Sequence, residues 1–255
     1  MADVGTWDPT SLIERDDLVQ IYKDSGETVH IGEGLPICSI KFAEMSKDMQ
    51  KYKGRFCFRT PTCKDEGGAL AVFQEMASRP TTIVALNIAV AYGLLSGHKC
   101  SCVDAVKAYV QSELKSKHPT YIEIPKYLCP REWRHMRRPV VRLVKALYGH
   151  PEAGGHWEKH LEAIIVAMGG KAIKGHPSCF WFPAPLKLLL IVYVDDLLLS
   201  GPEDKHAKFW EDLGKKVTVE PAEDLDRYLG RHHTMTPCNR LPYNLIEHFT
   251  SPIPV

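Results

Sequence analysis

The stretch LLLIVYVDDLLLS, Leu188 to Ser200, places two adjacent carboxylates, Asp195 and Asp196, in the middle of the most apolar run of the chain. Burying an ionised carboxylate without a partner is costly, and two neighbouring carboxylates also repel each other. The apolar residues on both sides predict two buried strands joined by a tight turn. A bound cation would compensate the charge. Asp also tolerates turn geometry, so a purely structural hairpin tip is the alternative.

Composition indicates an ordinary globular protein. The chain has 255 residues, of which 44% are hydrophobic and 25% charged. Its net charge is only +1, so any attraction to nucleic acid has to be local. The apolar run is too short to span a membrane and the first residues lack a secretion signal, so we expect an intracellular protein without a membrane partner. The cysteines lack a C-x-x-C pair, which favours reduced, buried thiols.

The pattern of elements predicts an α+β fold with one sheet backed by helices. The segment KYKGRFCFRT alternates, with Lys53 and Arg55 on one face and Phe56 and Phe58 on the other, as in a strand with a basic face. Residues 1–50 are weakly patterned and support no firm prediction. Helices are expected at 69–78, 82–95, 157–168 and 204–214, and further strands at 98–104, 120–125, 215–221 and 226–233.

A third oxygen ligand is needed if the paired aspartates hold a hard cation such as Mg²⁺. Asp104 is the best candidate, because it ends a β-prone segment with apolar flanks, as Asp195 does. Two such strands paired in the centre of a sheet would bring the carboxylates together. An ordinary strand-end aspartate is the alternative interpretation of Asp104 alone.

Four blocks in this order amount to a family resemblance. CVDAVKAYVQSEL, VVRLVKALYGHPEAGGHWEKHL, IVYVDDLLLSG and DRYLGRHH resemble the reverse transcriptase domain of copia-type LTR retrotransposons. The resemblance extends from about Lys51 to His233 and implies a right-hand polymerase palm with partial fingers. It divides the chain into an N-terminal segment (1–50), a fingers-palm domain (51–233) and a C-terminal tail (234–255). Few residues follow Gly230, so we expect a missing or truncated thumb and a fragment of a longer element.

The resemblance implies an RNA-directed DNA polymerase. Asp104, Asp195 and Asp196 fall on the family's catalytic aspartates, which hold two Mg²⁺ ions, with Mn²⁺ able to substitute. Such ions activate the primer 3′-hydroxyl and neutralise the departing pyrophosphate. The expected partners are dNTPs and an RNA or DNA template-primer.

The same resemblance implies a nucleotide pocket. Tyr109 falls where a bulky ring would exclude a 2′-hydroxyl, and Arg55, with Lys53 as a companion, falls where a basic strand grips the triphosphate. A core tyrosine and a solvated strand edge are the alternatives. Glu152 stands where the family has Gln, an unfavourable place for an anion unless Glu152 is turned away or protonated.

Two further segments suggest contacts with nucleic acid. Tyr228, Leu229 and Gly230 resemble the block that positions the primer terminus. Between Lys126 and Lys145 there are seven Lys or Arg residues and a single Glu, which suits either a template-primer backbone or an exposed loop without a ligand. The rival functions are a catalytically inactive nucleic-acid-binding remnant, favoured by Glu152 and the short C-terminus, and a two-metal hydrolase that uses the same carboxylates.

Overall fold

The apolar run forms the expected hairpin at the centre of the molecule. The computed structural model describes residues 5–41, 43, 46–74 and 79–234. β9 (Leu188–Tyr193) and β10 (Asp196–Pro202) pair antiparallel across the two-residue turn Val194–Asp195. Side chains on both faces of the two strands are buried, which explains why the run is continuously apolar instead of alternating.

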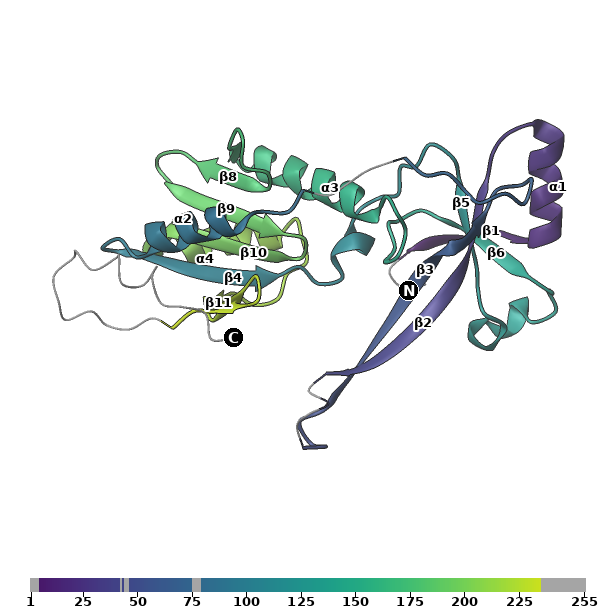
Figure 1. Ribbon diagram of the computed structural model, residues 1–255, viewed down its shortest axis with the longest axis horizontal. Coiled ribbons are helices and arrows are strands. Elements are labelled where there is room, and N and C mark those ends of the chain that lie inside the picture. The colour runs from purple at the N-terminus through teal and green to yellow at the C-terminus, as the bar shows by residue number, and fades with distance from the viewer. Residues whose placement is uncertain (1–4, 42, 44–45, 75–78, 235–255) are drawn as a thin grey trace.

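The hairpin belongs to a six-stranded sheet, on the left in Figure 1, with the strand order β11-β4-β10-β9-β8-β7. β10 therefore lies inside the sheet, between β4 and β9. The remaining strands of this sheet are β4 (His98–Asp104), β7 (Lys171–Ala172), β8 (Cys179–Phe182) and β11 (Glu223–Asp224).

Helices cover both faces of this sheet. α2 (Ile83–Gly93) packs on the face that carries Leu198, whereas α3 (Ala153–Ala167) and α4 (Glu203–Gly214) pack on the face that carries Leu197 and Leu199. α2 begins where the sequence predicts, because the Oγ1 atom of Thr82 accepts a hydrogen bond from the Ala85 amide at 3.2 Å. The core of this part of the molecule thus lies in two layers, one on each side of the sheet.

A second sheet lies beside the first, with the strand order β1-β6-β5-β2-β3 (Figure 1). Its helix α1 (Arg15–Ser25) follows directly after β1. β2 pairs with β5 only through residues 30–33, so β2 and β3 continue beyond the sheet as a two-stranded ribbon. The strands are β1 (Trp7–Glu14), β2 (His30–Lys41), β3 (Lys51–Lys64), β5 (Thr120–Glu123) and β6 (Pro139–Leu143).

Short elements complete the fold, and one of them, η2, lies on the connection from the first sheet to the second. The 3₁₀ helices are η2 (Ala108–Gln111), η3 (Lys126–Leu128) and η4 (Arg131–Trp133). The hairpin of β12 (Arg227–Tyr228) and β13 (Arg231–His232) forms a sheet of its own. Among the described residues, no helix is both long enough and apolar enough to cross a membrane.

The α+β class is confirmed, but several expectations about its parts are wrong. There are two large sheets instead of one, and β1 and β2 give the weakly patterned N-terminal segment a full place in the second. The expected boundary at residue 50 falls inside the β2–β3 hairpin. Of the predicted tail, only Thr234 lies among the described residues.

Three element predictions also need correction. Residues 69–74 form no helix, and 75–78 lie outside the described residues. The predicted strand at 215–221 is reduced to a single bridge between Val219 and Ala105. The predicted strand at 226–233 is instead a hairpin, because Leu229 and Gly230 both take positive φ angles, 49° and 75°, and turn the chain back.

Candidate active site

The strand register sets two of the three candidate aspartates, Asp104 and Asp196, opposite each other, and Asp195 lies on the adjoining turn. β4 ends opposite the start of β10, so that Asp104 is paired directly with Asp196. The amide of Ala105 donates to the carbonyl of Asp195 at 2.8 Å, which ties the end of β4 to the turn. Directly opposed residues of an antiparallel pair point their side chains to the same face, with Cβ atoms about 5 Å apart. The expected central pairing of these strands is therefore confirmed.

Crowding of negative charge is evident at Asp196. Burial raises the pKa of this carboxyl to about 6, and Asp195 and Asp104 add to the rise. An all-oxygen donor set of this kind fits a hard divalent cation, whose charge would relieve the repulsion. Within the described part of the chain, however, no three or more Asp, Glu, His or Cys side chains are placed so that they could hold a metal ion. The three carboxylates thus influence one another electrostatically, but they are not arranged as a complete set of metal ligands.

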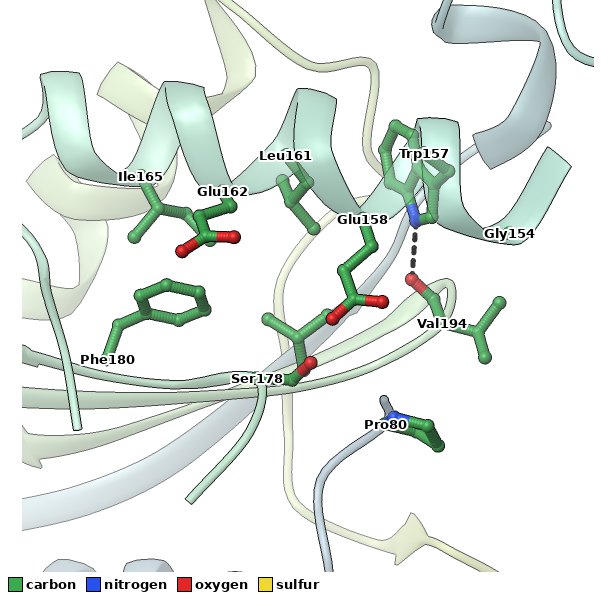
Figure 2. Close-up of a pocket in the computed structure, with 11 residues that line it drawn as sticks. Pro80, Gly154, Trp157, Glu158, Leu161, Glu162, Ile165, Ser178, Phe180 and Val194 are labelled. Atoms are coloured by element: carbon green, nitrogen blue, oxygen red, sulfur yellow. Dashed lines mark hydrogen bonds between the residues drawn. The ribbon is translucent and has the colours of Figure 1, made fainter. Parts of the chain in front are cut away.

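The turn that carries Asp195 is strained and clamped. Val194 has a φ angle of 57°, a conformation that β-branched residues rarely adopt. Figure 2 shows the clamp: Nε1 of the buried Trp157, on α3, donates to the Val194 carbonyl at 2.7 Å. The hydrogen bond satisfies a carbonyl that the tight turn leaves without a ladder partner, and it fixes the turn to α3.

A pocket lies on the α3 side of the turn. Its apolar lining comes from α3, β8 and β9, and the carboxylates of Glu158 and Glu162 lie along it (Figure 2). The Arg79 amide donates to Glu158 at 2.9 Å. The full lining is Pro80, Gly154, Trp157, Glu158, Leu161, Glu162, Ile165, Ser178, Phe180, Val192 and Val194.

Two tyrosine rings that contact each other lie within range of the Asp195 charge. Tyr109, on η2, contacts Tyr148, with ring centroids 4.6 Å apart. Burial raises the pKa of both phenols, that of Tyr148 to about 12, and the negative charge of Asp195 raises both further. Both hydroxyls therefore stay protonated at neutral pH. Of the predicted site residues, Tyr109 thus lies within electrostatic range of Asp195.

The basic strand also reaches this region. The predicted alternation is confirmed in β3, where Phe56 and Phe58 face the core of the second sheet. Arg55 lies on the opposite face, near enough to Tyr148 for its positive charge to oppose the rise in the phenol's pKa. Lys53 lies two residues along the same strand and therefore on the same face as Arg55.

Glu152 is turned into a buried network, which is one of the two arrangements considered for it. Its carboxylate accepts hydrogen bonds from the Ser116 hydroxyl at 2.5 Å and from the Gln74 amide at 3.0 Å, and His156 Nε2 lies 3.4 Å away. Burial alone would raise the pKa of Glu152, but these hydrogen bonds and the nearby His150 lower it below its ordinary value. Its oxygens are thus used within the fold and not at the three aspartates.

The β12–β13 hairpin packs next to Asp196. Tyr228 is buried in the α2-side core, and its hydroxyl lies 3.1 Å from the Asp196 carbonyl and 3.3 Å from the Ile191 carbonyl. Leu229 and Gly230 form the turn of this hairpin. The segment predicted to position a primer therefore adjoins the first residue of β10.

Two arginines of the basic stretch at 126–145 form ion pairs with α1 and with the second sheet. Arg137 pairs with Asp16 at 2.8 Å, and Arg138 pairs with Glu123 at 2.8 Å. Two of the seven basic side chains in this stretch therefore already form ion pairs within the protein.

Sequence reasoning missed the roles of Tyr148 and Trp157. Both lie in the quoted block VVRLVKALYGHPEAGGHWEKHL, but the helical spacing of Trp157 equally fits a core residue, and nothing local shows which residue the Tyr148 ring contacts. No protein-family model matches the chain, and a comparison with curated proteins found no match.

Proposed function

We propose that the chain is an RNA-directed DNA polymerase of the copia type, which adds deoxynucleotides to a primer 3′-hydroxyl. The observation that supports this most is the register of β4 and β10, which sets Asp104 opposite Asp196, with Asp195 on the adjoining turn. Residues far apart in the sequence thus form one acidic site, and a reaction on polyanionic phosphates with divalent cations gives such a site a purpose.

Each group of residues has a distinct part in this proposal. Asp104, Asp195 and Asp196 would hold the two Mg²⁺ ions. When bound, the ions lower the pKa of the attacking hydroxyl and neutralise charge on the phosphates. Tyr109 walls the sugar of the incoming nucleotide. Arg55 offers a fixed positive charge to its phosphates.

Primer extension tests the proposal directly. The purified chain, a primed RNA template, dNTPs and Mg²⁺ or Mn²⁺ should give a longer primer. Asp195→Asn should abolish extension, whereas Asp212→Asn, at a partly exposed position of α4 where the carboxylate pairs with Lys208, should leave it unchanged. Extension that persists undiminished in Asp195→Asn would show that the acidic site is not responsible.

The second candidate is a catalytically inactive nucleic-acid-binding remnant. It is favoured by one observation: in the described ranges, the acidic side chains are not arranged as a complete metal-binding group. This candidate predicts binding to primer-template that weakens as salt is raised, without extension in either metal. Absence of binding at low salt would eliminate it.

A further inference from the structure

The Tyr109–Tyr148 ring pair joins residues from different parts of the fold. Tyr109 follows β4 of the six-stranded sheet, whereas Tyr148 follows β6 of the second sheet. Their centroids are 4.6 Å apart and their planes are inclined by 60°. Such tilted contacts between aromatic rings are favourable beyond the area that they bury.

The backbone on the Tyr109 side is fixed. The Tyr109 carbonyl accepts hydrogen bonds from the Ser112 amide at 3.0 Å and from the Ser112 hydroxyl at 2.8 Å. The neighbours Ala108 and Val110 are buried, which anchors η2 on both sides of the ring. Only the side-chain torsions of Tyr109 are left to decide where its ring lies.

The Tyr148 side is fixed equally well, but from β3. The Tyr148 carbonyl accepts a hydrogen bond from the Phe58 amide at 2.7 Å. Gly149 follows with a φ angle of 85°, and a Cβ atom there would lie 2.2 Å from the Phe58 carbonyl oxygen, so this close approach requires glycine. The Tyr148 ring therefore projects from a platform that β3 holds in place.

We propose that Tyr148 is a positioning residue that sets the preference for deoxynucleotides by holding the Tyr109 ring in place. This inference rests on the proposed polymerase function, in which the Tyr109 ring excludes a 2′-hydroxyl by contact. Because Tyr148 fills the space beside Tyr109, the ring cannot swing aside to admit a ribonucleotide. The phenol hydroxyl of Tyr148 is not needed for this role, but its ring is.

The test compares kcat/KM for a dNTP and the matching rNTP in primer extension. Tyr148→Ala should reduce the dNTP/rNTP ratio by roughly three- to tenfold, as expected for losing one aromatic contact. The change should come mainly from a lower KM for the rNTP. Tyr148→Phe keeps the ring and should restore the wild-type ratio. Tyr148→Leu removes the ring contact but fills more of the space than alanine, so it should lower the ratio in the same direction by a smaller factor. It replaces Tyr148→Ala if the alanine variant does not fold.

Two controls separate this role from general damage. Ile21→Ala, on α1, alters an apolar side chain that is 53% exposed and should not change the ratio. In a Tyr109→Ala background, adding Tyr148→Ala should have no further effect on the ratio, because Tyr148 acts through Tyr109.

The outcomes are distinguishable. A wild-type chain that binds primer-template but extends with neither nucleotide overturns the proposed function, and this inference with it. Extension with an unchanged ratio in Tyr148→Ala and Tyr148→Leu overturns the inference alone. A shift that persists in the Tyr109→Ala background shows that Tyr148 contacts the sugar directly and overturns the positioning role.

Discussion

Trp157 holds the turn between β9 and β10 through a single hydrogen bond to Val194. The bond matters because Val194 takes a φ angle that its β-branched side chain opposes, so the surroundings have to maintain the conformation. Trp157, a residue of α3, thereby helps to fix the position of Asp195, the next residue of the turn.

Replacing Trp157 by Phe should lower the free energy of unfolding by about 1–2 kcal/mol, because the Val194 carbonyl loses its donor in a partly buried place. Urea denaturation measures this loss. Trp133→Phe, at a partly buried tryptophan that packs against the core of the second sheet, serves as a control and should cost less. Equal losses in the two variants would indicate that ring volume matters and the hydrogen bond does not.

His150 makes stability dependent on pH. It is buried between Phe58 and Phe73, with centroid distances of 5.1 and 5.0 Å, and burial lowers its pKa to about 4. In the unfolded chain the histidine takes up a proton near pH 6.5, so between pH 6.5 and 4 the unfolded state binds more protons. The stability that the neutral ring provides is complete above about pH 6.5 and falls as the pH drops toward 4.

The free energy of unfolding should thus decrease by about 2–3 kcal/mol between pH 7 and pH 4 because of His150. His150→Gln should flatten this part of the profile, measured by denaturant unfolding at several pH values. His135→Gln, on the exposed surface, should leave the slope as it is. A slope that is the same in the wild type and His150→Gln would contradict the assignment.

At the scale of single residues, the sequence shows which charged residues are unusual but not which side chains contact one another. Asp195 and Asp196 are conspicuous because an apolar run surrounds them, and Asp104 could be inferred from its similar setting. The partner of Tyr109 could not be inferred, because Tyr148 reaches it only after two sheets are placed side by side. The direction of Glu152 likewise depends on Ser116 and Gln74, which lie on distant segments.

Among the elements, the turn after β6 has the most exacting requirement. Gly149 combines a positive φ angle with a close approach to the Phe58 carbonyl, and its own carbonyl accepts a hydrogen bond from Thr60. This turn is where the second sheet touches the segment that leads into α3.

Gly149→Ala should therefore destabilise the protein by more than about 2 kcal/mol, since the added Cβ meets backbone and the φ angle becomes strained. Thermal unfolding measures the change. Gly214→Ala, at the end of α4, is the control, because a Cβ there has open space and alanine favours helix. A Gly149→Ala protein as stable as Gly214→Ala would mean that β3 can yield at this point.

Elements were predictable where local chemistry is strong. The helix after Thr82, the hairpin and the helix predicted at 157–168 follow from caps, turns and periodicity, and the structure has them. The segment 69–74 was misjudged because its alanines and leucine favour helix, whereas pairing of Leu70 with Lys64 holds it against β3. β1 and β2 have no clear strand pattern of their own. They are strands because they pair with β6, β5 and β3, and a single sequence does not show such pairing.

On the scale of the whole molecule, the class of fold could be predicted but the number of sheets could not. A pattern of strands and helices along a chain does not say which strands share hydrogen bonds. Here the second sheet combines strands that precede β4 in the sequence with strands that follow it. β2 pairs with β3 and, in parallel, with β5, and β5 pairs antiparallel with β6. The proposed site lies where this second sheet, through Tyr148, meets the first.

The order in which the chain visits its sheets has a consequence for protein engineering. It runs through β1 to β3, crosses to α2 and β4, returns to β5 and β6, and crosses again to α3 and the remaining strands. No single cut can release either half with all its strands, so deletion libraries and split-protein reporters should find no permissive breakpoint that yields two autonomous units. The two sheets therefore have to be made and folded as one continuous chain.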